Sequence, residues 1–169
     1  MAVITLKRGA QTVGFEQRAV PQIFIAHSLI SEKLVEKITT TLRQAQVNPL
    51  FAEQLQNQPL YVIIQALFQS DAMFMIITKK ALQRKTIRDW ILFELGLARA
   101  RWRPRVRGEI SQIPVFMWRE ITLRLSKEQP LGLVSEIKRV QMNSKRSREN
   151  MLGEMQIIAM NLSSRSFQL

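Results

Sequence analysis

The chain contains no cysteine, one histidine and six glycines in 169 residues. The absence of cysteine excludes disulfides and thiolate chemistry, and it suits the reducing environment of the cytoplasm. We expect no zinc site, because the chain has one histidine and no cysteine, and zinc sites in proteins usually need several such ligands. The glycines do not cluster, so the chain has no glycine-rich phosphate-binding loop.

Long apolar runs are also missing. No run approaches the length of a transmembrane helix, so we expect no membrane partner. The first 20 residues lack the apolar stretch of a secretory signal. We therefore expect a cytoplasmic protein, long enough to bury the core of one domain.

Basic residues are abundant and unevenly placed. The net charge is +12, and residues 99–124 contain seven bases against two acids. Five arginines alternate with other residues in this segment: Arg99, Arg101, Arg103, Arg105 and Arg107. Such a patch either binds nucleic acid or acidic lipid, or is a solvated helix end. We favour the solvated end, which predicts only weak, salt-sensitive binding to nucleic acid.

Apolar runs and helical periodicities alternate along the chain, which predicts an α/β fold with a parallel sheet between two helical layers. Buried strands are predicted at 22–26, 50–52, 72–78 and 113–118. Helices are predicted at 34–45, 60–67, 87–102, 131–142 and 150–162, and a basic loop at 79–85. Ligands of such sheets bind at the carboxyl ends of the strands.

Glu94 is the only charged residue in the apolar run from Trp90 to Ala98. In a helix, all of its neighbours one turn away are apolar. A carboxylate in such a place faces a packed surface or the wall of a cleft, and burial raises its pKa. It is either paired with Arg88, Arg99 or Arg101, or it is a functional carboxylate.

Six short motifs follow one another between residues 20 and 120. They are Phe24-Ile25-Ala26-His27-Ser28, Phe51-Ala52-Glu53, the loop 53–60, Ile63-x-x-Ala66-x-x-x-Ser70-Asp71-Ala72, Trp90-x-x-x-Glu94-Leu95-Gly96-x-Ala98 and Ile113-Pro114-Val115. In this order and spacing they resemble a Toll/interleukin-1 receptor (TIR) domain of the bacterial or archaeal kind.

The resemblance implies a flavodoxin-like parallel sheet of about five strands, with helices on both faces and a helical C-terminal extension. It divides the chain into an N-terminal segment (1–20), a TIR-like domain (21–142) and the extension (143–169). Because TIR-like domains commonly work as assemblies, it also implies self-association or binding to another TIR-like protein.

Many TIR domains of this kind cleave NAD at the nicotinamide–ribose bond. The resemblance therefore implies an NAD hydrolase or cyclase in signalling or antiviral defence, with NAD as substrate and no separate cofactor or metal. Glu94 takes the place of the catalytic carboxylate, which would stabilise the oxocarbenium-like ribose left when nicotinamide departs. The positions implied to bind substrate are Ala26, His27, Ser28, Phe51, Glu53, Pro59 and Trp90.

The sequence leaves several points open. Ala26 replaces the family's usual serine, and the loop before Leu60 has Gln58-Pro59 in place of a Pro-Gly pair. His27 is a general base or, as we favour, a residue that lines the cleft or caps a helix. Phe51 and Trp90 either stack on a substrate ring or belong to the core.

Two functions other than catalysis also remain. One is a non-enzymatic module that self-associates or binds another TIR-like domain. The other is a nucleotide-sensing or nucleic-acid-binding protein that uses the arginine segment. An apolar stripe on the last predicted helix packs on its own domain or on a second copy, and we favour the second copy. It comprises Met151, Leu152, Met155, Ile158 and Leu162.

Overall fold

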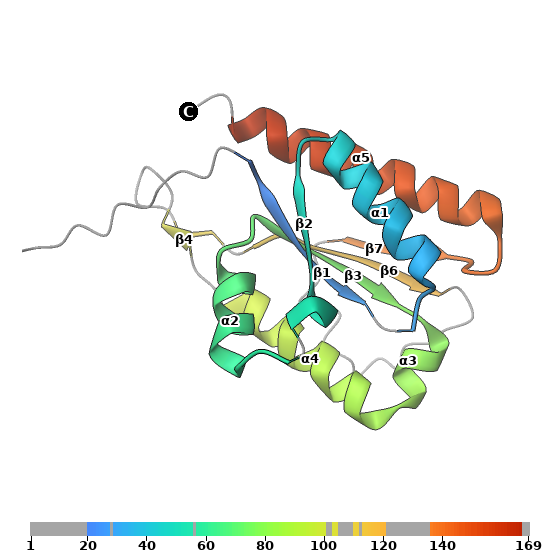
Figure 1. Ribbon diagram of the computed structural model, residues 1–169, viewed down its shortest axis with the longest axis horizontal. Coiled ribbons are helices and arrows are strands. Elements are labelled where there is room, and N and C mark those ends of the chain that lie inside the picture. The colour runs from blue at the N-terminus through green and yellow to red at the C-terminus, as the bar shows by residue number, and fades with distance from the viewer. Residues whose placement is uncertain are drawn as a thin grey trace, which may run out of the picture.

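The predicted α/β class is confirmed. A computed structural model describes residues 20–27, 29–55, 57–100, 103–104, 110–111, 113–120 and 136–166. Its main sheet has five parallel strands in the order β2-β1-β3-β6-β7, which is the flavodoxin-like arrangement. Helices cover both faces, α1 and α5 on one side and α2 and α4 on the other (Figure 1).

The strands of this sheet are β1 (Gln22–His27), β2 (Asn48–Phe51), β3 (Ala72–Ile77), β6 (Val115–Glu120) and β7 (Glu136–Val140). The helices are α1 (Glu32–Gln44), α2 (Leu60–Phe68), α3 (Lys79–Gln83), α4 (Lys85–Ala100) and α5 (Lys145–Ser166), with a 3₁₀ turn, η1 (Ala52–Leu55). Two short antiparallel strands, β4 (Arg103–Pro104) and β5 (Ile110–Ser111), form a separate ribbon.

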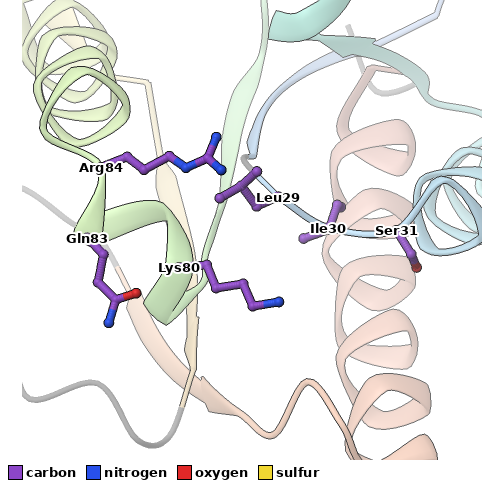
Figure 2. Close-up of a pocket in the computed structure, with 6 residues that line it drawn as sticks. All are labelled: Leu29, Ile30, Ser31, Lys80, Gln83 and Arg84. Atoms are coloured by element: carbon purple, nitrogen blue, oxygen red, sulfur yellow. The ribbon is translucent and has the colours of Figure 1, made fainter.

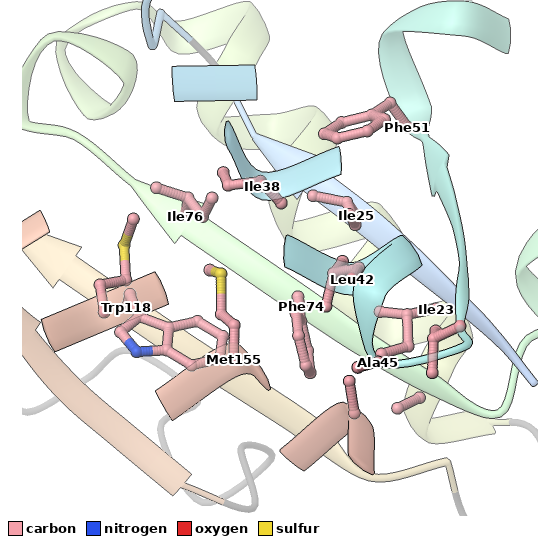
Figure 3. Close-up of a cluster of buried hydrophobic side chains, with 14 of the residues drawn as sticks. Ile23, Ile25, Ile38, Leu42, Ala45, Phe51, Phe74, Ile76, Trp118 and Met155 are labelled. Carbon is pink, nitrogen blue, oxygen red and sulfur yellow. The ribbon is translucent and has the colours of Figure 1, made fainter. Parts of the chain in front are cut away.

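The central strands are covered on both faces of the sheet, so the sheet separates two hydrophobic cores. Every residue of β1 and β3 is buried, as their continuous apolar sequences predict for strands covered on both faces. Successive side chains point to opposite faces of a sheet. Ile25 therefore packs with α1 and α5, whereas its neighbour Ala26 packs with α2 and α4. Figure 3 shows the first core, in which Phe74, Trp118 and Met155 lie together.

The predicted basic loop at 79–85 is instead helical over most of its length. The Thr78 hydroxyl accepts a hydrogen bond from the Ala81 amide at 3.2 Å, which caps α3. The Glu120 carboxylate accepts a further bond, at 2.7 Å, from the Lys79 amide. Five residues are too few for a helical period to show in the sequence. The cap from Thr78 stabilises α3 locally.

The prediction of a helix at 131–142 was wrong for Glu136–Val140, which form strand β7. Among the described strands, β7 lies at the edge of the sheet and pairs with β6 alone. Edge strands tolerate charged residues, and Lys138 and Arg139 interrupt the apolar pattern that identifies the central strands. The fifth strand was therefore mistaken for a polar helix.

The apolar stripe of α5 packs on its own domain, so our preference for a second copy was wrong for this face. Met151, Met155 and Ala159 are buried in the core that α1 covers, and Leu152, Ile158 and Leu162 pack against it. The Trp118 indole Nε1 also donates to Glu154 Oε2 at 2.9 Å. Helix α5 is therefore one of the two helices that cover this face.

Two methionines of α5 test this placement as a matched pair. Met155 is fully buried, whereas Met160 is 54% exposed on the outer side of the same helix. Met155→Ala should lower the free energy of unfolding by about 2–5 kcal/mol, because it leaves a cavity in the core. Met160→Ala should change it by less than about 0.5 kcal/mol. Urea denaturation measures both, and equal small losses would contradict the buried position of α5.

Candidate functional site

Glu94 lies on the inner face of α4, where the helix packs against the sheet. Ile91, Leu95 and Ala98 recur at helical spacing and belong to the same buried core as Ala26. Glu94 follows Ile91 by three residues, so the helix turns it toward that face. Only 2% of its surface is exposed. The helical periodicity therefore forces an acid into an apolar layer.

A single hydrogen bond is the interaction that the structure describes for the Glu94 carboxylate. The Trp90 indole Nε1, one turn earlier in α4, donates to Glu94 Oε1 at 2.9 Å. Burial raises the pKa of Glu94 to about 7, and the bond from Trp90 opposes this increase by favouring the charged form. The carboxylate is thus close to half-ionised at neutral pH.

The ion pair considered from the sequence is not found among the described side chains. No lysine or arginine of this set lies within ion-pair distance of Glu94, and Arg88 contacts Asp89 instead, with Nε and Oδ1 3.6 Å apart. The side chains of Arg99 and Arg101 lie outside the described residues. Within the described part of the chain, Glu94 is a buried acid with a neutral partner and no compensating charge.

A pocket of about 510 Å³ has Trp90, the hydrogen-bond donor to Glu94, in its wall, whereas Glu94 itself does not line it. The two aromatic rings in its wall, Trp90 and Phe93, are tilted by 38° with their centroids 5.3 Å apart. Trp90 is 40% exposed, yet its indole nitrogen reaches Glu94. Trp90 is therefore the residue that contacts both the pocket and the carboxylate. The lining residues are Leu60, Lys85, Thr86, Asp89, Trp90 and Phe93.

A second group of predicted residues meets at the carboxyl ends of β1 and β2. The rings of His27 and Phe51 pack edge to face with centroids 5.4 Å apart. His27 Nδ1 lies 3.3 Å from Glu53 Oε1, but neither ring nitrogen has a hydrogen-bond partner among the described residues. Burial lowers the pKa of His27 to about 4 and raises the pKa of Glu53, so both shifts favour the neutral forms. The imidazole is therefore neutral at pH 7, despite the carboxylate nearby.

The structure divides the predicted site residues between the two faces of the sheet. Phe51 belongs to the core under α1 and α5, whereas Ala26 belongs to the core under α2 and α4, where Glu94 lies. No contact among the described residues joins His27 to Glu94. Pro59 is exposed immediately before α2. Ser28 lies outside the described residues.

Of the six residues that line the pocket of about 510 Å³, only Trp90 was predicted from the sequence, and Phe93 and Leu60 show why the others were missed. Phe93 follows Trp90 by three positions, which places both rings on neighbouring parts of the helix surface. That spacing was a usable signal. Leu60 comes from the start of α2, and its proximity to α4 depends on tertiary packing that no local pattern reveals.

No family model matches the chain, and no curated protein matches its sequence. Among the described residues, no three acidic or histidine side chains are grouped to hold a metal ion. No helix in the same part of the chain combines the length and apolarity needed to cross a membrane. Most of the arginine segment lies outside the described residues.

The buried neutral state of His27 predicts a loss of stability in acid. The unfolded chain binds a proton near the ordinary pKa of 6.5, whereas the folded chain does so only near pH 4. Stability from this residue is therefore complete above pH 6.5 and is lost as the pH falls toward 4. Relative to His27→Gln, wild type should lose about 3 kcal/mol of unfolding free energy between these limits.

Urea unfolding at several pH values measures this difference, with pH 7.5 as the reference at which the imidazole is neutral in both states. Only the change in the difference between the two proteins matters, so the absolute cost of the substitution cancels. Parallel stability curves for wild type and His27→Gln would show that His27 titrates normally when folded.

Proposed function

We propose that the chain is a TIR-like NAD glycohydrolase or cyclase that cleaves the nicotinamide–ribose bond, with Glu94 as its catalytic carboxylate. The observation that carries the proposal is a buried acid, without a counter-ion among the described residues, that accepts a hydrogen bond from a wall residue of an aromatic pocket. Its cellular role would lie in signalling or defence, as the resemblance to bacterial and archaeal TIR domains implies.

Electrostatics links this acid to a cationic reaction. A buried carboxylate without a counter-ion is stabilised by any positive charge that approaches it in a medium of low dielectric constant. The nicotinamide ring of NAD is cationic, and the ribose becomes oxocarbenium-like as the bond to nicotinamide breaks. Glu94 would stabilise that developing charge, and no strong general acid is needed because nicotinamide leaves as a neutral molecule.

The pocket wall is suited to a flat, cationic ring. Trp90 and Phe93 offer aromatic faces, which attract a cation through the ring quadrupole as well as by stacking. Because Glu94 is buried and does not line the pocket, whereas its hydrogen-bond partner Trp90 does, a ligand would have to draw that ring aside before the ribose reaches the carboxylate. Trp90 would thus act as a gate and as a stacking surface.

Exposed apolar side chains favour one second candidate, a non-enzymatic module that associates with itself or with another TIR-like domain. Leu60 and Tyr61 at the start of α2 are 49% and 67% exposed, and Leu92 and Phe93 on α4 are also exposed. Neighbouring apolar residues on a surface are typical of protein contacts. The same residues border the proposed substrate pocket, so assembly and substrate access would compete or cooperate there.

Nicotinamide release from NAD tests the proposal at high protein concentration. Glu94→Gln keeps the size and the hydrogen-bond acceptor for Trp90 but cannot become charged, so activity should fall by at least about a hundredfold. The matched control is Glu36→Gln, since Glu36 is an exposed glutamate on α1. The variant at Glu36 should retain wild-type activity.

The pH profile supplies a second readout of the same role. Since Glu94 must be ionised, kcat/KM of wild type should rise about tenfold per pH unit below 7 and level off above it. Equal activity of wild type and Glu94→Gln would refute the assignment. An inactive wild type that sediments as an oligomer would favour the interaction module.

A further inference from the structure

A second pocket, of about 500 Å³, lies at the carboxyl edge of the sheet between β1 and β3 (Figure 2). One wall is the segment that follows β1. The other wall is α3, which follows β3, together with the C-cap residue of that helix, Arg84. Volumes of this size are typical of sites for small molecules. The lining residues are Leu29, Ile30, Ser31, Lys80, Gln83 and Arg84.

The chain connections explain why the sheet is open at this point. From β1 the chain turns to α1 on one face, and from β3 it turns to α3 and α4 on the other face (Figure 1). The two connections diverge, so they leave a crevice between adjacent strands β1 and β3. In doubly wound sheets this switch point is the common place for a ligand.

Two cationic side chains dominate the wall that α3 provides. Lys80 and Arg84 are four residues apart, and no carboxylate among the described residues lies within ion-pair distance of either. In Figure 2 both side chains extend toward the opposite wall, whereas Gln83 points away from it. The nearby acid Glu120 binds the Lys79 amide instead. The pocket thus carries positive charge that the described residues do not neutralise.

The opposite wall supplies hydrogen-bond donors. Ser31 stands at the N-cap of α1, but its hydroxyl makes no capping bond to the helix, so it is free to face a ligand. The first amides of a helix also favour an anion. Glu32, the acid in the first turn, is exposed and does not line the pocket.

We propose that this switch-point pocket binds the diphosphate group of a small molecule, with Lys80 and Arg84 neutralising its charges and Ser31 donating a hydrogen bond. A diphosphate presents two linked anionic centres, one for Lys80 on α3 and one for Arg84 at the C-cap of that helix, whereas a monophosphate presents one. The assignment does not rest on the chemistry of Glu94. It adds a ligand class to the part of the fold that the proposed catalysis leaves unused.

Calorimetric titration of the full chain with inorganic pyrophosphate, at constant ionic strength, tests the pocket. Lys80→Gln/Arg84→Gln should weaken binding by at least about tenfold, since charge-assisted bonds are lost. Lys37→Gln/Arg43→Gln removes the same charge from exposed positions of α1 and should bind as wild type does. Ser31→Ala, which changes no charge, should weaken binding several-fold.

Because pyrophosphate has no nicotinamide–ribose bond, the result is independent of NAD cleavage. The substituted lysines and arginines are exposed, and equal thermal midpoints of the variants confirm that the fold is intact. Equal losses in both double variants would reduce the effect to net charge and overturn the proposal. So would absence of saturable binding to wild type, and equal affinity for phosphate and pyrophosphate would overturn the assignment to a diphosphate.

Discussion

Burial of the central strands on both faces is the constraint from which the rest of the molecule follows. The strands β1 and β3 expose no residue to solvent, so each face of the sheet must be covered by helices that turn an apolar side inward. Helix α4 is one of these. Its inner side includes Glu94, because the helical period places that residue beside Ile91 and Leu95.

Burial of Glu94 destabilises its charged form, and the same burial strengthens the attraction of the carboxylate to a cation. An ionised carboxylate in an apolar layer loses hydration, and the single bond from Trp90 replaces only part of it. No lysine or arginine among the described side chains lies within ion-pair distance of this carboxylate, so a cation that approached it would be strongly favoured. Trp90, which bonds Glu94, also lines the aromatic pocket, and this shared residue connects the packing of α4 to the proposed cleavage of NAD.

Sequence reasoning predicted the parts of the fold that depend on local pattern. The apolar runs of β1 and β3 identify buried strands, and the run around Glu94 identifies a buried acid on a helix. The edge strand β7 was missed because charged residues conceal its period, and α3 was missed because a side-chain cap rather than a repeat defines it.

Local sequence patterns could not predict which residues meet at the sheet and its helices. The family resemblance implied one substrate site for His27, Phe51 and Glu94, but the alternation of side chains along β1 turns His27 toward the Phe51 side, away from Ala26 and α4. Likewise the packing of α5 on α1 is a long-range contact. The cationic pair in the second pocket was visible in the sequence, yet only the position of α3 at the switch point gives it a ligand-facing role.

The proposed function depends on Glu94 being a buried carboxylate, which has no counter-ion among the described residues. Carbon-13 NMR of the chain labelled at glutamate side-chain carboxyls measures its ionisation directly, with the resonance assigned by its loss in Glu94→Gln. We expect a titration midpoint near pH 7, well separated from those of exposed glutamates. A midpoint at or below the ordinary value of 4.5 would mean that Glu94 is solvated or ion-paired, and would contradict the account.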